Sequence, residues 1–495
     1  MVRFGGAIFL VRFCLKKSPV VWFKKVSKKR QSDNGAEMKC SRADSLSAVY
    51  RIPDIKFEDQ RMTSFAGIVM YQALFQALGL KEGLRSCFSH LKVSPIFGHH
   101  MITLLLVVHI LIGFRRLRDR DYYHDDPMIQ RVLGVKRIPD VSTITRVIKS
   151  ADEESIEKVR ILNKSLVMDR LEKELASRVT IDFDGSVLTT QTRAEGTAVG
   201  FNRKKKGARS YYPLFATIAQ TSQVFDMHHR SGNVHDSNGS TEFMFDVFMA
   251  IRERLPGAVL ESRVDGAFFE EDRFRMMEEV GVEFSASVPF ERFPELKGMI
   301  EARRRWKRID DTWSYFEADW KPKSWPQRFR FIFIRQTAKR QHKGPLQLDL
   351  FVPVDHEYQY KVIVTNKTCS AKKVLNFHNG RGSQEAVLAQ LKSGAQIDYI
   401  PTKSLIANKL YSWAAILAHN LHFEMQMRYK TPDRSTTERR TPLWTFTTLN
   451  TIRQRLIQRA GRLTRPQGNL VLTMSGNEAV REDLIAFLNA AQDAS

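Results

Sequence analysis

The sequence predicts a mixed α/β protein: one sheet with helices on its faces, preceded by a helical region. Three observations support this fold class. From about residue 55 to 175, apolar residues recur at the three- and four-residue spacing typical of helices. At Arg178 the pattern changes to RVTIDFDGSVL, which alternates and is rich in β-branched residues. Beyond it, strand-like and helix-like segments follow one another, as in a sheet covered by helices.

Length and charge limit the number of structural units and the kind of partner that the chain can have. At 495 residues the chain exceeds one ordinary core and should divide into two or three units. A hydrophobic fraction of 43% is typical of globular proteins. The formal charge of +24 predicts an anionic partner, most economically the phosphates of nucleic acid. A membrane surface is the alternative, but the basic residues are spread along the whole chain and not gathered on one amphipathic helix.

The cysteines and the apolar runs argue against a zinc protein, a disulfide scaffold and a membrane protein. The four cysteines form no CxxC pair, which argues against zinc and a disulfide scaffold and fits a reducing cytoplasm. The apolar run Met101–Phe114 is shorter than the roughly 20 residues of a membrane span, so we expect a buried helix. Residues 1–30 carry nine Lys or Arg and no acid, and lack the apolar core of a signal peptide. We interpret residues 1–48 as a basic arm and linker, or as an extended start upstream of a true initiator at Met38 or Met62.

Residues 49–175 are predicted to form a helical DNA-binding domain. Met128–Leu133 is expected to be a short helix, and Ser142–Lys149 a second one with Ser142 as its N-cap. The second helix would present Arg146 and Lys149, as the recognition helix of a helix-turn-helix does. The turn between them is longer than usual, so a plain helical hairpin stays an alternative.

The α/β part is predicted over residues 176–290 and 371–430. Its first segment should contain strands within 178–188, 211–220, 224–232, 258–265 and 282–288, and helices at 241–254 and 270–280. Its second should contain a long apolar helix at 404–429.

Residues 291–370 and 431–495 differ from this part in character. The first stretch is basic and aromatic, with strand-like runs at 329–335, 348–353 and 360–365, and we interpret it as a β-rich insertion. The tryptophans in it either fill a small core or stack on an unpaired base. The second stretch is a C-terminal region rich in arginine.

Two acidic positions end predicted strands. Asp184 is followed by Gly185, which lets the backbone turn away and leaves the carboxylate at the sheet edge, where open α/β sheets bind ligands. Asp182 lies on the same face, so either carboxylate, or both, could bind a metal. Asp265, followed by Gly266, repeats the design. Ordinary surface carboxylates and a simple Asp-Gly turn are the alternatives.

A third acidic position lies in HNGRGSQEAVLAQLK, residues 378–392. Arg381, Glu385, Leu388 and Lys392 are spaced to share one helical face, either as a phosphate and metal site or as a solvated salt-bridged face. Three carboxylates from separate segments suit Mg²⁺, which takes oxygen ligands and completes its shell with water and substrate phosphate. Lys204, Lys205 and Lys206 form a basic run that either is solvated or contacts phosphates.

TIDFDGS, RVDGAFF and HNGRGSQEAVLAQLK, in that order, resemble the signature blocks of bacterial insertion-sequence DDE transposases of the group 1 type. The resemblance covers about residues 120–470. The last block is similar to the motif Tyr-x2-Arg-x3-Glu-x6-Lys of one transposase group. His378 stands in the Tyr position, and Arg381, Glu385 and Lys392 fill the others.

This resemblance implies an RNase H-like catalytic domain interrupted by the β-rich insertion. Asp184, Asp265 and Glu385 would be the catalytic, metal-binding triad, with Ser186 in the hydroxyl position that selects Asp184 over Asp182. Residues implied or interpreted as contacting DNA are Arg381, Lys392, His378, Arg146, Lys149, Lys204, Lys205 and Lys206.

The activity implied is transposition of DNA. Such enzymes use Mg²⁺, for which Mn²⁺ substitutes, to cut terminal inverted repeats and join the 3′-hydroxyls to target DNA, as a dimer. We expect a bacterial, cytoplasmic, nucleoid-associated protein without a membrane segment. A catalytically idle DNA-binding descendant and an RNase H-like nuclease are the alternatives.

Overall fold

The computed structural model describes residues 54–92, 97–174, 177–202, 204–235, 238–337 and 358–492. The basic arm and the strand predicted at 348–353 lie outside these residues. The chain divides into two compact units, residues 1–58 and 59–495, and every element below belongs to the second. None of the described helices combines the length and the apolar character needed to cross a bilayer.

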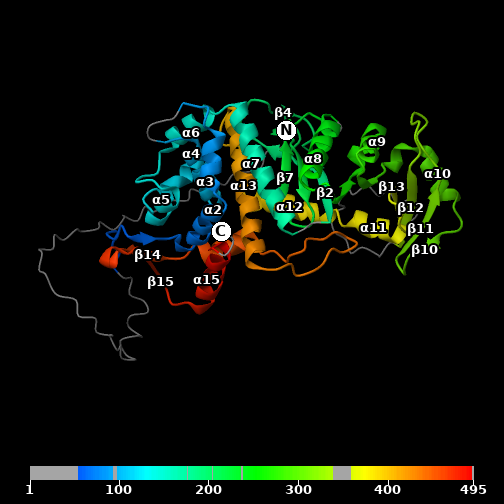
Figure 1. Cartoon of the computed structure of the whole chain (residues 1–495). Helices are drawn as coiled ribbons and strands as arrows, with labels where there is room; N and C mark the ends of the chain where they lie inside the picture. The colour runs from blue at the N-terminus through cyan, green and yellow to red at the C-terminus, as the bar shows by residue number, and fades with distance from the viewer. Residues whose placement is uncertain are drawn as a thin grey trace, which may run out of the picture. The chain divides into compact units, whose positions relative to one another are not determined.

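A nine-stranded mixed sheet confirms the predicted α/β class (Figure 1). Its strand order is β10 (Lys307–Arg308), β11 (Trp313–Ala318), β12 (Arg330–Thr337), β13 (Tyr358–Thr365), β9 (Glu283–Ser287), β8 (Val259–Val264), β2 (Arg178–Gly185), β6 (Leu214–Ile218) and β7 (Val224–His228). β8 is parallel to both of its neighbours, β2 and β9, whereas the other pairs are antiparallel. The strands of the predicted insertion therefore extend the large sheet and do not form a sheet of their own.

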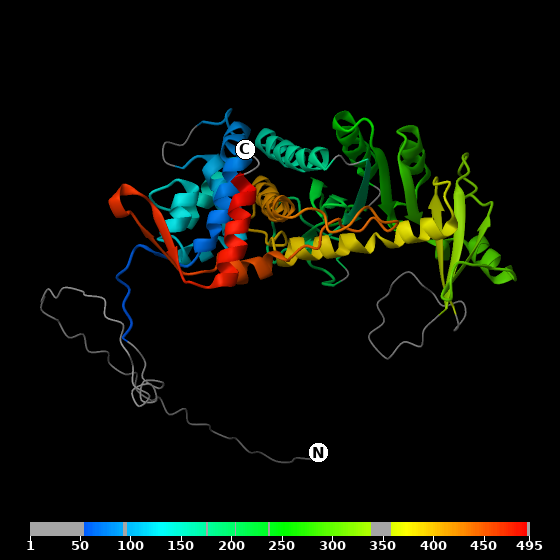
Figure 2. The same ribbon diagram turned by 60° about the horizontal axis from the view of Figure 1, so that its bottom comes forward.

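Helices cover both faces of this sheet. The helices here are α8 (Ser240–Arg254), α9 (Glu271–Glu279), α10 (Pro294–Ala302), α11 (Ala371–Asn379) and α12 (Gly382–Ser393). Phe183 of β2 packs edge-on against Phe243 and Phe248 of α8. Because side chains alternate along a strand, Asp182 and Asp184 lie on the opposite face. That face is the one α11 and α12 cover, lying end to end in Figure 2.

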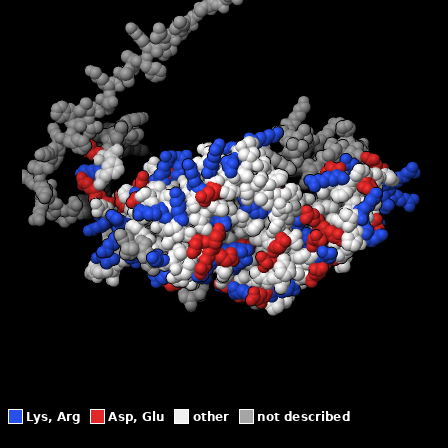
Figure 3. Space-filling model, turned by 90° about the horizontal axis from the view of Figure 1, so that it is seen from above, with Lys and Arg blue, Asp and Glu red and all other residues white. Residues whose placement is uncertain are grey.

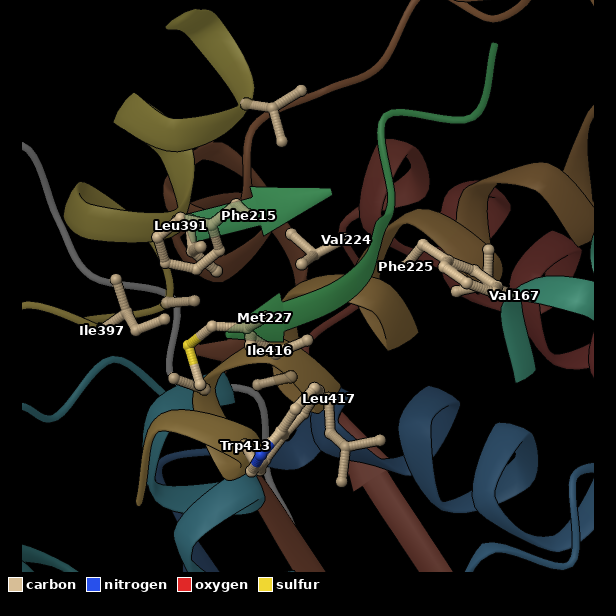
Figure 4. Packing of buried hydrophobic residues seen from close by; sticks show 14 of the residues in the cluster. Val167, Phe215, Val224, Phe225, Met227, Leu391, Ile397, Trp413, Ile416 and Leu417 are labelled. Atoms are coloured by element: carbon tan, nitrogen blue, oxygen red, sulfur yellow. The ribbon is translucent and has the colours of Figure 1, made fainter. Parts of the chain in front are cut away.

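The helical region is a bundle built around one long helix. Its members are α2 (Val69–Ala77), α3 (Leu80–Cys87), α4 (His99–Leu111), α5 (Pro127–Leu133), α6 (Val141–Lys149), α7 (Glu153–Lys173), α13 (Leu405–Tyr429) and α15 (Glu478–Gln492). α13 packs against α4, α6, α7 and α15, and also against β7. Figure 4 shows Trp413, Ile416 and Leu417 of α13 in the same cluster as Met227 of β7 and Leu391 of α12. One hydrophobic core therefore joins the bundle to the sheet.

The C-terminal region folds back onto the N-terminal part of the unit. β14 (Gly461–Thr464) pairs with β1 (Met62–Thr63) on one side and with β15 (Val471–Met474) on the other. α15 packs against α2 and α13. Between α13 and β14, α14 (Leu449–Ile452) continues into a π-helical turn, Arg453–Ile457. Arg453 of that turn donates to the carbonyls of Leu111 and Gly394, which ties the region to the end of α4.

A second, small sheet and several short helical turns complete the described unit. β3 (Leu188–Thr189), β5 (Arg209–Tyr211) and β4 (Ala198–Val199) form a three-stranded sheet inserted between β2 and β6. The short helical turns are Ala66–Ile68, Leu117–Tyr122, Gly266–Phe268, Phe290–Arg292 and Pro466–Gly468.

Two local predictions need correction. The N-cap of α6 is Asp140, which accepts from the Thr143 amide at 2.7 Å; Ser142 lies inside the helix and donates to Asp140. The segment predicted as one helix over 378–392 divides at Gly380 into α11 and α12. A Cβ at Gly380 would lie 1.8 Å from the Arg439 carbonyl oxygen, so only glycine allows this approach.

Candidate active site

Asp184 and Asp265 lie at the same edge of the sheet, on neighbouring parallel strands. β2 and β8 pair in a register that sets Asp182 opposite Arg263. Two residues further along, Asp184 is the second-to-last residue of β2, and Asp265 directly follows the end of β8. The Asp265 carboxylate accepts from the Ala267 amide at 2.9 Å and begins the short turn Gly266–Phe268. Both carboxylates therefore stand at the carboxyl ends of their strands, where open α/β sheets place ligands.

Asp182 is committed to a buried ion pair. Its two carboxylate oxygens accept from Nε and Nη2 of Arg263, each at 2.6 Å, and both side chains are fully buried. Burial raises the pKa of the Asp182 carboxyl, and the charge of Arg263 opposes that rise. Such a two-pronged pair leaves no exposed oxygen for a metal. The environment of Asp182 therefore differs from that of the acidic side chains at the strand ends, and its share in metal binding stays a prediction.

Three contacts hold α11 and α12 against the strand ends. The Gln384 side-chain amide donates to the Asp182 carbonyl at 2.8 Å. His378 is held between the hydroxyls of Ser285 and Ser287 on β9, at 3.0 and 2.9 Å. Arg263 also donates to the Phe377 carbonyl. These contacts fix where Arg381 and Glu385, the next residues on this face, meet the sheet.

His378 is a structural residue in this arrangement. Its side chain is buried, and burial together with the charge of Lys361 lowers the pKa of the imidazole well below its ordinary value. The ring is therefore neutral and bonded through both nitrogens to serines. His378 is also among the residues that line the cavity described below, and its contact with DNA stays a prediction.

Arg381 lies among the candidate catalytic carboxylates. Its Nη2 is 3.6 Å from Oδ2 of Asp265. Burial alone would lower the pKa of the guanidinium, but the charges of Asp184 and Asp265, and more weakly those of Asp182 and Glu385, raise it above its ordinary value. All three predicted triad members thus act on one cation.

A cavity of about 230 Å³ opens at this place. The side chains that line it and carry charge are Asp265, Lys361, Arg381 and Glu385. Glu385 is exposed on α12, one turn beyond Arg381. The structure therefore brings Asp265, Arg381 and Glu385 into one cavity, with Asp184 on the adjacent strand end.

The donor set fits a hard divalent cation. Asp184, Asp265 and Glu385 offer carboxylate oxygens, the ligands that Mg²⁺ prefers, and an open cavity leaves room for water and phosphate. Within the described residues, only His90, Asp152 and Glu154 bring three donor atoms within 4.8 Å of one another. There the Lys158 ammonium already contacts Glu154 at 2.7 Å and His90 at 3.2 Å, so that group has its own cation. The carboxylates of Asp184, Asp265 and Glu385 do not form such a group, and Arg381 lies among them.

Basic side chains predicted to bind DNA fall into two groups. Lys392 lies beside the catalytic strand end, where its Nζ donates to the Val187 carbonyl at 3.1 Å. Burial lowers the pKa of this ammonium, and the charge of Lys204 adds to the effect, so Lys204 lies near it. Lys204, Lys205 and Lys206 are exposed on the loop between β4 and β5. This loop is therefore near Lys392.

The second basic group is on α6, in the helical bundle. Arg146 and Lys149 are exposed, and with Ser142, Thr145 and Ser150 they line a shallow hollow. Ile144 and Ile148 on the other side of α6 are buried in the core. The helix thus presents a polar, basic face, as the sequence predicted. Figure 3 shows that basic and acidic side chains are interspersed on the face seen from above.

Three tryptophans of the predicted insertion pack in or against the main hydrophobic core. Trp325 is buried and stacks on Phe269 at 4.8 Å, and Trp320 packs edge-on against Phe293. Trp306 is half-buried, with the guanidinium of Arg335 4.7 Å above its ring. Trp320 and Trp325 therefore have a packing role, as one interpretation expected, but the core they fill is the large one and not a small core of the insertion.

Sequence reasoning missed two buried charges beside the site. Glu261 and Arg263 alternate along β8, and Asp265 follows at the same spacing just beyond the strand end. Glu261 is fully buried and bonded to Lys367, Arg178 and Arg440. The sequence contained a signal of these charges, Glu-x-Arg-x-Asp in a strand whose other residues are mostly apolar. Charges at alternate positions of such a strand indicate buried ion pairs.

Fold and site together place acidic side chains at the carboxyl ends of neighbouring strands of a large mixed sheet, beside basic side chains that suit an anionic substrate. The chain matches the family model Transposase DDE domain group 1 over residues 50–494 and belongs to that family. No curated protein matches it.

Among solved structures, the chain is similar to a piggyBac transposase synaptic complex with hairpin DNA. The two are 12% identical, the match covers 72% of this chain and 74% of that one, and the TM-score is 0.41. Two Mos1 transposase structures, a paired-end complex with the left transposon end and a pre-cleavage transpososome, match with 10% identity. Each covers 39% of this chain and 60% of the other, with a TM-score of 0.17.

Proposed function

We propose that this chain is a DNA transposase of the bacterial insertion-sequence type, with an RNase H-like catalytic domain. It binds terminal inverted repeats, cleaves the element ends and joins the 3′-hydroxyls to target DNA, as a homodimer in the cytoplasm. One observation carries the proposal: Asp184, Asp265 and Glu385 come from three distant segments and converge on Arg381 at one sheet edge. Family membership supplies the reaction class.

The residues divide the work as follows. Asp184, Asp265 and Glu385 would hold Mg²⁺ or Mn²⁺, which when bound activates the attacking oxygen and steadies the leaving one. Arg381, once freed from Asp265, would bind a phosphate of the strand being cut. Lys392 and the run Lys204–Lys206 would hold the flanking backbone, and Arg146 and Lys149 of α6 the repeat itself.

The test is cleavage of a duplex oligonucleotide that carries the inverted repeat flanking the gene. The full-length chain is incubated with Mg²⁺, and the cut strands are mapped on a denaturing gel. We expect Glu385→Gln to lower the cleavage rate by about a thousandfold or more, since a metal ligand is lost. Affinity for the duplex should stay within about threefold, because the variant keeps every basic side chain.

Glu253→Gln is the matched control, since Glu253 is an exposed acid on α8 away from the triad. It should cleave at the normal rate. Cleavage by Glu385→Gln at that same rate would refute the triad. Tight repeat binding without cleavage by the unaltered chain would instead favour an idle DNA-binding descendant. Cutting of unrelated duplexes as fast as the repeat would favour a nuclease.

A further inference from the structure

Lys361 is a cation in an apolar interface. It lies on β13, directly opposite Ile334 of β12 and two residues before Ile363. Both isoleucines belong to the cluster that packs under Val374 and Leu375 of α11. Opposed and alternate residues share a face, so Lys361 continues this apolar row. A lysine is an unfavourable choice for such a position, because its ammonium must leave water.

The end of the Lys361 side chain reaches the catalytic cavity. Lys361 lines that cavity together with Asp265, Arg381 and Glu385. Its Nζ lies 3.4 Å from Oδ1 of Asn379, a neutral partner at the end of α11. Burial, and after it the charge of Arg381, lowers the pKa of the ammonium to about 8, so it is still mostly charged at neutral pH.

The cavity therefore holds two cations with different partners. Arg381 is paired with Asp265. Lys361 has three N–H donors, and a long contact with one amide oxygen uses at most one of them. A phosphate non-bridging oxygen is an acceptor of the right charge for the rest, and charge-assisted bonds of this kind are the strong ones.

We propose that Lys361 binds a DNA phosphate in the catalytic cavity, donating from Nζ to a non-bridging oxygen. This inference rests on the function proposed above, since it takes DNA as the occupant of the cavity. Lys361 then reaches the cavity from β13, where it lies opposite Ile334 of β12. An apolar side chain would suit this row better, and giving up stability for a substrate contact is a trade that active sites commonly make.

The experiment compares Lys361→Met with Lys372→Met, a control at an exposed lysine on α11. Met keeps the length of the side chain and suits the apolar row. We expect Lys361→Met to unfold at the same temperature as the parent chain or a higher one. Its Mg²⁺-dependent cleavage of the repeat duplex should fall by about a hundredfold, the usual loss when one preorganised donor is removed. Lys372→Met should be normal in both assays.

A binding assay without metal identifies the contact. Repeat duplexes carry a single methylphosphonate, which removes one phosphate charge, placed in turn at each position around the outer end. One position should weaken binding of the parent chain severalfold while Lys361→Met shows no further loss there, since the two changes remove the same contact. Lys361→Gln, which can still bond Asn379, repeats the test if Lys361→Met folds poorly.

Normal cleavage by Lys361→Met, or an equal methylphosphonate penalty at every position in parent and variant, would overturn the inference. Failure of the proposed function gives another pattern. In that case the parent chain and Glu385→Gln cleave the repeat equally or not at all, whatever residue stands at 361.

Discussion

At the scale of single residues, Asp182 and Asp184 are two positions apart but lie in different environments. Asp182 is fully buried and paired with Arg263. Asp184 stands at the end of its strand, as Asp265 does on the neighbouring strand. The strand pattern left both Asp182 and Asp184 open, because they share one strand face, and the family resemblance selected Asp184 through Ser186. The arginine opposite Asp182 adds a structural difference between them, which only the register of β2 against β8 shows.

The buried pair predicts a large stability effect. Arg263→Met leaves the Asp182 carboxylate buried without a partner and deprives the Phe377 and Arg439 carbonyls of their donor. Breaking such a pair costs about 3–5 kcal/mol of unfolding free energy. Denaturant unfolding should show this loss.

Asp265→Asn is the contrasting variant. Its side chain is partly exposed and near other acids, so its unfolding free energy should change by less than about 1 kcal/mol or rise slightly. Equal unfolding free energies for Arg263→Met and Asp265→Asn would show that the buried pair does not contribute to stability.

At the scale of elements, most strands and helices of the α/β part were predictable from periodicity. α8, β8, α9 and β9 lie within one or two residues of the predicted segments, and β2 begins at the predicted residue and ends three residues earlier. The break between α11 and α12 was not predictable. Gly380 keeps helical dihedrals, and the group that requires glycine there, the Arg439 carbonyl, is distant in the sequence. The return of β14 to β1 was also beyond sequence reasoning, since such short strands carry little pattern.

The α11–α12 junction predicts a matched pair of glycine variants. Gly380→Ala would place a Cβ 1.8 Å from the Arg439 oxygen, so the helix or the loop must shift. We expect a loss of about 1–3 kcal/mol in unfolding free energy, as for other overpacked sites. Repeat cleavage should fall as well, since the shift moves Arg381 and Glu385.

Gly298→Ala is the control, because nothing lies within 4 Å of its would-be Cβ and it is exposed on α10. Alanine inside this helix should raise stability by up to about 1 kcal/mol and leave cleavage normal. A Gly380→Ala variant that behaves like Gly298→Ala in both assays would rule out the close approach as the reason for the glycine.

At the scale of the whole molecule, the candidate site exists only because the chain returns to one sheet edge three times. Residues 182–184, 263–265 and 381–385 are separated by long stretches, and the core around α13 holds the sheet and the bundle in one unit. The order and spacing of the three motifs were readable in the sequence. Their convergence on Arg381, and the presence of Lys361 in the same cavity, could be seen only in the fold.

The central claim is that Asp184, Asp265 and Glu385 hold one metal site, and a change of metal preference tests it most directly. Asp265→Cys replaces a carboxylate by a thiolate in the full-length chain. Mg²⁺ demands oxygen ligands, whereas the transition metal Mn²⁺ accepts sulfur more readily.

Cleavage of the repeat duplex is measured with each metal, with Glu253→Cys as the control. We predict that Asp265→Cys is inactive with Mg²⁺ and regains cleavage with Mn²⁺, while Glu253→Cys keeps the metal preference of the parent chain. An Asp265→Cys variant that cleaves normally with Mg²⁺ would contradict the account.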